Sequence, residues 1–317
     1  MIRFQRGASK SVLLLTAASI CCSYSLSPRS KAATRAIRSF EAAADRFFQA
    51  HRRLPEPPVR HAQLENLCKE APRAILIVGD VHGCYNELMA LHERALLEAP
   101  DIDCVILVGD LVNKGPDSAK VLRHVRETPN WFSVRGNHEQ GALKAALRDP
   151  KRMNRSTYNW IIPAKLSDSE VQWIADMPFT IRISKRWWDT PEPVDRVVVH
   201  GGLVPGVALD KQDGDVMVTL RDLRCDVQDT VVRYEALDKE DATEERVGWA
   251  SCWDWKTEGC YVVFGHDARR GLQEYDGVIG LDSGACYGKK LSGLVLERNG
   301  KRTIVQTDAE EVHCPIK

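Results

Sequence analysis

The chain has 317 residues, of which 44% are apolar and 28% are charged, a balance typical of a folded globular protein. Its 44 Lys and Arg residues equal its 44 Asp and Glu residues, so the formal net charge is zero. A neutral chain has no global field that attracts nucleic acid or membrane, and we expect no sequence-specific nucleic-acid binding. Any attraction for an anionic substrate must be local to a site.

The first 60 residues differ in composition from the rest. Residues 1–40 carry seven Lys or Arg and no acidic residue, and an apolar stretch at 11–22 has roughly the length of a signal-peptide core. That stretch is short for a transmembrane helix, which needs about 20 apolar residues, although a membrane anchor extending to residue 26 is conceivable. The Arg-rich, acid-free character also suits an organelle transit peptide. Localisation therefore stays open between secretory or anchored, organellar and otherwise cytoplasmic.

Two further features complete this N-terminal region. Apolar residues recur at helical spacing over 33–52, and the Pro-rich run from Leu54 to Pro58 predicts a stiff linker. We expect residues 1–60 to form a targeting or anchor segment, a helix and a linker, and residues 70–310 to form the catalytic domain.

Ten cysteines are spread along the chain without a Cys-x-x-Cys pair. This spacing argues against a structural zinc module and favours reduced, packed thiols. A disulfide framework remains the alternative, and it depends on the compartment.

From residue 72 the chain alternates apolar runs with amphipathic helices. Buried strands are predicted at 74–78, 105–108 and 131–134, and a helical pattern follows each of them. Three strand–helix units predict β-α-β crossovers, a largely parallel sheet and an α/β fold. Another helix is predicted over 167–177, where Ser167 and Glu170 can form a capping box. Further strands are predicted at 179–183, 196–199, 261–264, 278–281, 291–296 and 303–306.

Five of these strands end in polar residues flanked by glycine. The residues concerned are Asp80, His82, Asp110, Asn137, His138, His200 and His266. One such group is usually structural, but five are hard to explain as turns, because ligands bind at the carboxyl ends of strands in α/β sheets. Carboxylate, amide and imidazole groups suit divalent ions such as Mn, Zn or Fe, with Mg or Co possible in vitro. If one carboxylate bridges, the set is sufficient for two metal ions, which can clamp both oxygens of an in-line displacement.

The motifs around these residues resemble those of a known family. Gly-Asp80-x-His82-Gly, Gly-Asp110, Gly-Asn137-His138-Glu, His200-Gly and Gly-His266-Asp are similar to the calcineurin-like metallophosphoesterases, in their phosphoprotein-phosphatase-type branch. The resemblance covers roughly residues 73–297. Within the branch, Val-Asn113-Lys114-Gly-Pro looks most like the diadenosine-tetraphosphatase-like (ApaH-like) phosphatases. The resemblance implies a central β-sandwich flanked by helices, with the metals at its top edge.

The resemblance also implies a role for each site residue. Asp80, His82 and Asp110 would hold one metal, and Asp110, Asn137, His200 and His266 would hold the other, with Asp110 as the bridge. His138 would donate a proton to the leaving oxygen. Arg135 and Arg221 would bind phosphoryl oxygens, because guanidinium groups suit that bidentate task. The implied reaction is in-line attack of a metal-bridging hydroxide on phosphorus.

Two positions depart from the Ser/Thr phosphatase pattern, where Asp-Arg stands in place of Asn113-Lys114. Asn113 can hydrogen-bond His138 but stabilises its cation less than a carboxylate would. Lys114 keeps the positive charge but lacks the guanidinium fork. Both changes suit a leaving group that needs little protonation, such as a phosphate.

The sequence therefore predicts a metal-dependent phosphatase acting on phosphate esters or anhydrides. Candidate substrates are phosphorylated small molecules, above all dinucleoside polyphosphates, together with inorganic polyphosphate and capped RNA ends. The first alternative is a Ser/Thr phosphoprotein phosphatase, and the second is a non-catalytic metal-binding scaffold.

Overall fold

The computed structural model describes residues 54–146, 158, 160–161, 166–191, 193–228, 231–237 and 246–315. The chain divides into two compact units, Met1–Pro55 and Glu56–Lys317. The predicted targeting or anchor segment and the predicted helix at 33–52 lie outside the described residues. Of the helices that are described, none is long and apolar enough to cross a membrane.

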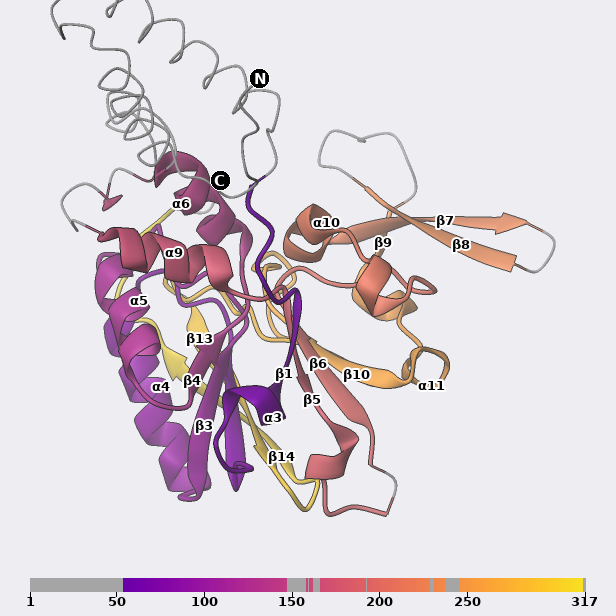
Figure 1. Ribbon diagram of the computed structural model, residues 1–317, viewed down its shortest axis with the longest axis horizontal. Coiled ribbons are helices and arrows are strands. Elements are labelled where there is room, and N and C mark those ends of the chain that lie inside the picture. The colour runs from indigo at the N-terminus through magenta and orange to yellow at the C-terminus, as the bar shows by residue number, and fades with distance from the viewer. Residues whose placement is uncertain are drawn as a thin grey trace, which may run out of the picture. The chain divides into compact units, whose positions relative to one another are not determined.

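Two sheets form the centre of the second unit (Figure 1). The five-stranded sheet has the order β14-β13-β2-β3-β4, and the six-stranded sheet has the order β1-β5-β6-β10-β12-β11. The first contains β2 (Ala74–Val78), β3 (Ile102–Leu107), β4 (Trp131–Ser133), β13 (Lys290–Glu297) and β14 (Arg302–Asp308). The second contains β1 (His61–Gln63), β5 (Thr180–Ile183), β6 (Asp195–Val199), β10 (Cys260–Phe264), β11 (Gln273–Tyr275) and β12 (Val278–Gly280).

The predicted β-sandwich is confirmed by the core between these sheets. Ile75 and Ile106 of the five-stranded sheet belong to one buried cluster with Ile181, Val198 and Val263 of the six-stranded sheet. These side chains are at most 2% exposed. Burial of apolar surface on both facing sides, at roughly 25 cal/mol per Å², is the main force that holds the two sheets together.

Helices cover the outer faces of the sandwich. Helix α4 (Tyr85–Glu98) contacts β13 and β14, and α5 (Ser118–Glu127) contacts β4. The amphipathic pattern predicted after the first strand is confirmed in α4, where Leu88, Leu91 and Ala95 are fully buried. The remaining helices are α3 (Leu64–Leu67), α6 (Asn137–Ala146), α9 (Asp168–Asp176), α10 (Gly214–Thr219) and α11 (Trp255–Glu258), with 3-10 turns at Lys185–Trp187, Leu209–Lys211 and Trp249–Cys252.

The expectation of a largely parallel sheet is correct only for part of the fold. Strands β2, β3 and β4 pair in parallel, as the three strand–helix units require. Strand β13, however, pairs antiparallel with both β2 and β14, and β5 pairs antiparallel with β6. Both sheets are therefore mixed, because short connections such as the one between β13 and β14 can join only antiparallel strands.

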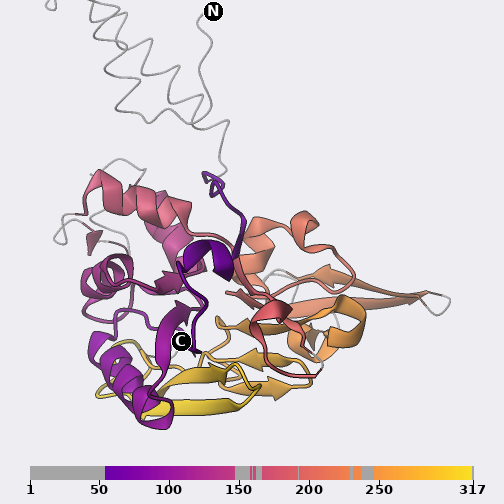
Figure 2. The same ribbon diagram turned by 60° about the horizontal axis from the view of Figure 1, so that its bottom comes forward.

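A third sheet was not predicted. It consists of β7 (Asp222–Gln228), β8 (Val231–Ala236) and β9 (Val247–Gly248), in the order β8-β7-β9. Figures 1 and 2 both show the β7–β8 hairpin extending away from the two main sheets. Charged residues interrupt the apolar alternation here, so the sequence carries no clear strand signal.

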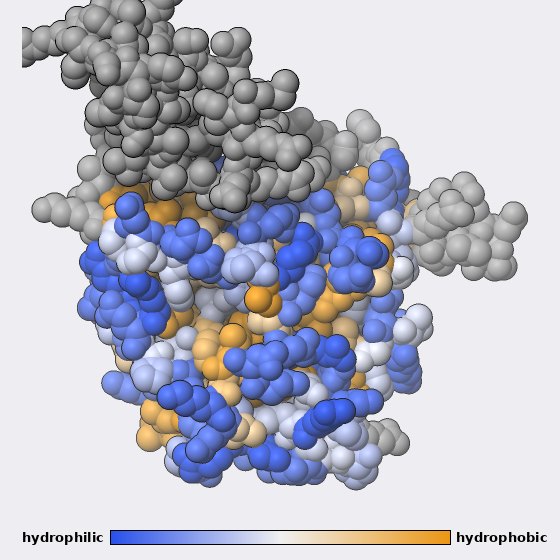
Figure 3. Space-filling model, in the orientation of Figure 1, coloured by the Kyte–Doolittle hydropathy of each residue, from blue (hydrophilic) through white to orange (hydrophobic). Residues whose placement is uncertain are grey.

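The surface seen in Figure 3 is largely hydrophilic, with smaller apolar areas between the polar ones. Large apolar side chains that are exposed in the described part of the chain are scattered, at Val59, Leu67, Leu97, Val247, Tyr275 and Val312. Eight described cysteines, from Cys68 to Cys314, are free thiols.

Candidate active site

The polar residues predicted at the strand ends meet at one edge of the sandwich. Asp80 and His82 follow β2, Asp110 follows β3, Asn137 and His138 follow β4, His200 follows β6, and His266 follows β10. The side chains of Asp80, His82, Asp110, His200 and His266 are all buried. Two sheets thus contribute to one cluster, because the carboxyl ends of β2, β3, β4, β6 and β10 lie at the same edge.

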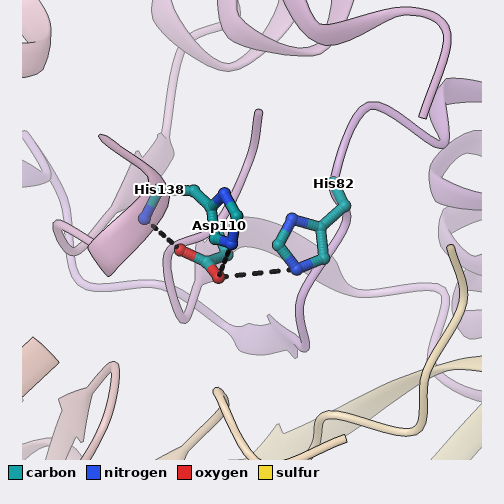
Figure 4. A group of neighbouring side chains, drawn as sticks. All are labelled: His82, Asp110 and His138. Carbon is teal, nitrogen blue, oxygen red and sulfur yellow. Dashed lines mark hydrogen bonds and ion pairs between the residues drawn. The ribbon is translucent and has the colours of Figure 1, made fainter. Parts of the chain in front are cut away.

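Asp110 is at the centre of this cluster. Its Oδ2 lies 3.4 Å from His82 Nε2 and 3.9 Å from His138 Nε2. Its Oδ1 lies 3.3 Å from His200 Nε2 and also accepts the backbone N–H of His138 at 2.9 Å. Figure 4 shows the carboxylate of Asp110 between the imidazole of His82 and residue His138. One carboxylate therefore faces imidazoles on both of its oxygens.

Backbone carbonyls fix the orientation of the imidazole rings. His82 Nδ1 lies 3.1 Å from the carbonyl oxygen of Val112, and His200 Nδ1 lies 2.9 Å from that of Val108. A carbonyl can only accept, so each Nδ1 carries the proton and donates it. The Nε2 of both rings is then left as a lone pair that faces Asp110, as in metal sites where outer partners set the tautomer.

The donor set fits divalent cations. Asn137 Oδ1 lies 3.0 Å from His200 Nε2, and Asp110 Oδ1 lies 3.3 Å from the same nitrogen. Three atoms that offer lone pairs thus approach one another, which is unfavourable unless a cation lies among them. The ligand atoms of Asp110, His200 and His266 lie within 4.8 Å of one another, and so do those of His82, Asp110 and His138. Asp110 belongs to both groups.

Asp80 is held at the edge of the cluster. Its Oδ1 and Oδ2 accept the backbone N–H of His266 at 3.0 and 3.1 Å, and Oδ2 lies 4.0 Å from His82 Nε2. Asp282, a buried residue that the sequence did not single out as a site residue, is hydrogen-bonded to Asp80. Burial, together with the charges of Asp282 and Asp110, raises the pKa of Asp80 well above its ordinary value. A bound cation would offset this cost.

Strained backbone is concentrated at the site. Of the non-glycine residues with positive φ in the described ranges, His82, Asp110, Asn113, Lys114 and His266 are predicted site residues, with φ between 48° and 74°. Such conformations each cost on the order of 1–3 kcal/mol and persist only where the surroundings enforce them. Neighbouring glycines allow the close approach: a Cβ on Gly136 would lie 2.3 Å from Asp110 Oδ1, and one on Gly265 would lie 2.0 Å from Asp80 Oδ1.

Charge at the site is set by burial and by a few neighbours. Burial lowers the pKa of His82, His200 and His266, which favours the neutral rings that can act as ligands, and it also lowers the pKa of His138. Burial acts to raise the pKa of Asp110, but the surrounding imidazoles and Lys114 overcome this and hold it below its ordinary value. Asp110 is therefore ionised at the centre of the cluster.

Glu139 is a positioning residue that the sequence reasoning missed. Its Oε2 accepts the backbone N–H groups of Asp110 and Gly136, each at 2.8 Å, and its Oε1 accepts that of Leu111 at 2.9 Å. This fully buried carboxyl therefore fastens the loop after β3 to the loop after β4. The motif Gly-Asn137-His138-Glu139 places Glu139 next to the predicted site residues, but the sequence does not show which backbone N–H groups this side chain binds.

Asn113 contacts His138 as predicted. The amide nitrogen of Asn113 lies 2.9 Å from His138 Nδ1, and the hydroxyl of Tyr158 lies 3.5 Å from the same atom. A neutral side-chain amide can bond this ring but adds no charge to stabilise its cation. No sequence signal pointed to Tyr158, because the intervening segment has no recognisable pattern.

Lys114 is turned into the site. Its Nζ lies 2.7 Å from His82 Nε2 and 5.1 Å from the ring centroid of Tyr287. The ammonium therefore donates to the lone pair that a metal ion would take. Burial acts to lower the pKa of Lys114, but Asp110 and other neighbours raise it above its ordinary value, so the side chain is charged.

The two predicted phosphate-binding arginines differ in their surroundings. Arg221 donates to the carbonyl of His266 at 2.8 Å, lies 3.9 Å from Asp267 Oδ1 and is 24% exposed in its side chain. Arg135 is only 1% exposed, donates to the carbonyl of Ala175 and packs 5.1 Å from the ring centroid of Phe179. The described contacts thus bring Arg221 beside the proposed metal-binding cluster but direct Arg135 toward the C-terminal end of α9 and Phe179.

Comparison with known proteins agrees with this geometry. The family model for calcineurin-like phosphoesterases matches residues 73–281. The chain is 27% identical over 284 residues to a symmetrical bis(5'-nucleosyl)-tetraphosphatase of Ralstonia nicotianae, covering 75% of this chain and 95% of that protein. A protein of the same name from Salmonella paratyphi C is 26% identical over 264 residues, covering 70% and 90% of the two chains.

A solved structure described as "Crystal structure of a putative diadenosine tetraphosphatase" is 32% identical to this chain. It superimposes with a TM-score of 0.61, over 79% of this chain and 98% of the other. The match of the family model covers more than half of the chain and spans the loops that carry Asp80, Asp110, Asn137, His200 and His266. The chain therefore belongs to the calcineurin-like phosphoesterase family and is a hydrolase of phosphorylated substrates.

Proposed function

We propose that this protein is a dinuclear-metal phosphatase that hydrolyses phosphoanhydrides of the dinucleoside polyphosphate type. The observation that carries the proposal is the convergence of imidazole and amide lone pairs on both oxygens of Asp110. Asp80, His82 and Asp110 would hold one ion, and Asp110, Asn137, His200 and His266 the other. When bound, two such ions supply charge stabilisation for the phosphoryl oxygens and a nucleophile near neutral pH.

The side chains around the cluster position the substrate. Arg221 is fixed by the carbonyl of His266 and by Asp267, and its partly exposed guanidinium can donate two parallel hydrogen bonds to a phosphate. Lys114 adds a second positive charge beside His82. Both cations would attract a polyphosphate to a chain whose net charge is zero.

His138 would hold a proton for the leaving oxygen. Its Nε2 is 3.9 Å from Asp110 Oδ2, and its Nδ1 contacts the Asn113 amide rather than a carboxylate. An amide stabilises the imidazolium less, so the site suits leaving groups that need little protonation. A nucleoside phosphate is such a group, whereas a serine alkoxide is not, which favours anhydrides over phosphoproteins.

The similarity to proteins named symmetrical bis(5'-nucleosyl)-tetraphosphatases supports the same substrate class. It extends over most of this chain and includes the loops that carry the site. Inorganic polyphosphate and capped RNA ends contain the same anhydride linkage and belong in the same test.

The proposal is tested by substrate hydrolysis with the full chain, stripped of metal and then supplied with Mn²⁺ or Zn²⁺, and the nucleotides or phosphate formed are separated and measured. The substrates are diadenosine tetraphosphate, polyphosphate, a capped oligonucleotide, p-nitrophenyl phosphate and a phosphopeptide. We expect metal-dependent turnover, fastest on diadenosine tetraphosphate, that falls at least 100-fold in Asp110→Asn. Asp210→Asn, a matched change on the surface, should leave the rate unchanged.

Two results would contradict the proposal in different ways. Fastest turnover of the phosphopeptide would identify a protein phosphatase. Metal binding without turnover of any substrate would identify a non-catalytic metal-binding scaffold.

A further inference from the structure

A second group of metal-binding side chains lies at the start of α4. Cys84 is the N-cap residue of this helix, Glu87 lies in its first turn, and His313 comes from the segment after β14. The Cys84 sulfur, a Glu87 carboxylate oxygen and a His313 ring nitrogen all lie within 4.8 Å of one another. We propose that these three side chains bind a structural zinc ion that fastens the C-terminal segment to α4.

The distances suit a tetrahedral site. Zinc bonds of about 2.0 Å to oxygen or nitrogen and 2.3 Å to sulfur place neighbouring ligand atoms roughly 3.3–3.8 Å apart. His313 Nε2 is 3.7 Å from Glu87 Oε1, which is already within that range. The remaining separations, at most 4.8 Å, need a contraction of at most about 1.5 Å.

Glu311 orients the imidazole of His313. The Nδ1 atom of His313 lies 3.5 Å from Glu311 Oε1, so the carboxylate draws the ring proton to that nitrogen. The Nε2 atom is then left with a lone pair that faces Glu87. A carboxylate behind a histidine is the usual arrangement at zinc sites, where it fixes the tautomer and raises the basicity of the ligand.

Backbone contacts hold the C-terminal segment at this place. The N–H groups of His313 and Cys314 both donate to the carbonyl of Cys286, at 3.1 and 3.0 Å. The N–H of Glu310 donates to Glu87 Oε1 at 3.2 Å, and Val312 forms a β-bridge with Tyr287. These contacts place His313 opposite Cys84 and Glu87 without any contribution from the ion. Metal binding therefore needs to order the C-terminal segment only slightly further.

Burial explains why a cation is favoured. Cys84 is 1% exposed and Glu87 is 3% exposed, and a buried carboxylate is costly unless it is paired or coordinates a metal. The side chain of His313 is 11% exposed, which leaves an entry path from solvent, and a water molecule would serve as the fourth ligand. Thiolate, imidazole and carboxylate together favour zinc over magnesium or calcium, which prefer oxygen alone.

The chemistry of the donors allows this site to be distinguished from the active site. The proposed catalytic ligands are oxygen and nitrogen atoms, whereas the proposed zinc site contains a sulfur atom. Cobalt(II) bound through a thiolate gives a sulfur-to-cobalt charge-transfer absorption that oxygen and nitrogen ligands do not give. The test is therefore a titration of the metal-stripped full chain with Co²⁺, followed by displacement with Zn²⁺.

We expect the wild type to develop this absorption at one equivalent of cobalt per site and to lose it when zinc is added. Cys84→Ser should abolish this absorption, and His313→Gln should weaken cobalt binding at least tenfold. Glu311→Gln should also weaken cobalt binding at least tenfold, because residues that hydrogen-bond a metal ligand contribute 10–100-fold to metal affinity. Cys225→Ser, which removes an exposed thiol elsewhere, and Asp110→Asn should both keep the absorption.

Two results would overturn the proposal. One is a wild type that binds cobalt without thiolate absorption. The other is an absorption that is unchanged in His313→Gln, a partly exposed position whose substitution should not prevent folding. Because Asp110→Asn is measured in parallel, neither result depends on whether the catalytic cluster binds metal.

Discussion

At the scale of single residues, the proposed function predicts that the contact between Asn113 and His138 controls which leaving groups the site can serve. The amide lies 2.9 Å from His138 Nδ1 and carries no charge. Asn113→Asp would place a carboxylate there and stabilise the imidazolium. We expect the ratio of alkyl phosphate turnover to anhydride turnover to rise about tenfold, since acid catalysis matters most for poor leaving groups. Steady-state kinetics on both substrates measure this ratio, and an unchanged ratio would show that Asn113 does not limit proton donation.

Lys114 presents a second prediction at this scale. Its ammonium is 2.7 Å from the His82 nitrogen that a metal would bind, so the two cations compete. Lys114→Met should therefore tighten Mn²⁺ binding several-fold, while KM for a polyphosphate substrate rises because a positive charge is lost. Calorimetric titration and steady-state kinetics test both effects. Lys144→Met, an exposed position on α6, is the control, and weaker metal binding in Lys114→Met would exclude competition.

Glu139 links two loops through three backbone N–H groups. In Glu139→Gln the amide can accept only through its oxygen, so buried donors lose partners at a cost of about 1–3 kcal/mol. We expect lower stability in urea unfolding and a loss of activity of at least tenfold, because Asp110, Asn137 and His138 would shift. The exposed Glu93→Gln should change neither quantity. Wild-type activity in Glu139→Gln would show that the loops hold their positions without this carboxylate.

At the scale of secondary-structure elements, the start of α9 is both capped and tethered. Ser167 and Glu170 form the predicted capping box, and Arg123 of α5 donates to Glu170 Oε1 at 2.6 Å. The hydrogen bond from Arg123 is the main cause that lowers the pKa of Glu170 from 4.5 to about 2. The pair therefore stabilises the fold fully above pH 4.5, and this stabilisation is lost as the pH falls toward 2.

Glu170→Gln should reduce the free energy of unfolding by about 1–2 kcal/mol at pH 7, a value that allows for the partly exposed arginine. The difference from wild type should shrink as the pH is lowered from 4.5. Urea unfolding at pH 7, 4 and 3 measures it, with Glu98→Gln as an exposed control. A difference that stays constant at pH 3 would mean that the cap, rather than the ion pair, provides the stability.

The elements that the sequence predicted share strong local signals. The apolar run of β2 matches its predicted bounds, 74–78. Helix α9 (Asp168–Asp176) lies within the predicted 167–177 because the capping box at its start could be recognised in the sequence. The hairpin of β7 and β8 was missed because its stability depends on pairing between strands rather than on an apolar pattern. The antiparallel addition of β13 to β2 joins residues about 215 positions apart, as the pair Gly293 and Val78 shows, and no local pattern reports such a pairing.

The site was predictable to a similar extent. The glycine-flanked strand ends indicated which residues would converge, because chain direction alone brings the carboxyl ends of strands together. The contacts of Glu139, Tyr158 and Lys114 depend on how loops pack in space, and the buried environment of Arg135 depends on α9 and Phe179. These features follow from tertiary packing, which the sequence pattern does not encode locally.

At the scale of the whole molecule, the sandwich is what assembles the proposed metal centre. The five-stranded sheet supplies Asp80, His82, Asp110 and Asn137, and the six-stranded sheet supplies His200 and His266. The buried core between the sheets therefore sets the distance between the two halves of the ligand set. Changes that loosen this core should affect metal binding before they affect the helices outside it.

The most direct test of this account is a crystal structure of the full chain with Mn²⁺, measured for anomalous scattering. We predict two anomalous peaks, roughly 3.5–4 Å apart, on either side of Asp110 and within bonding distance of His82, His200 and His266. A single peak beside Asp110, or none there, would contradict the dinuclear centre on which the proposed function depends.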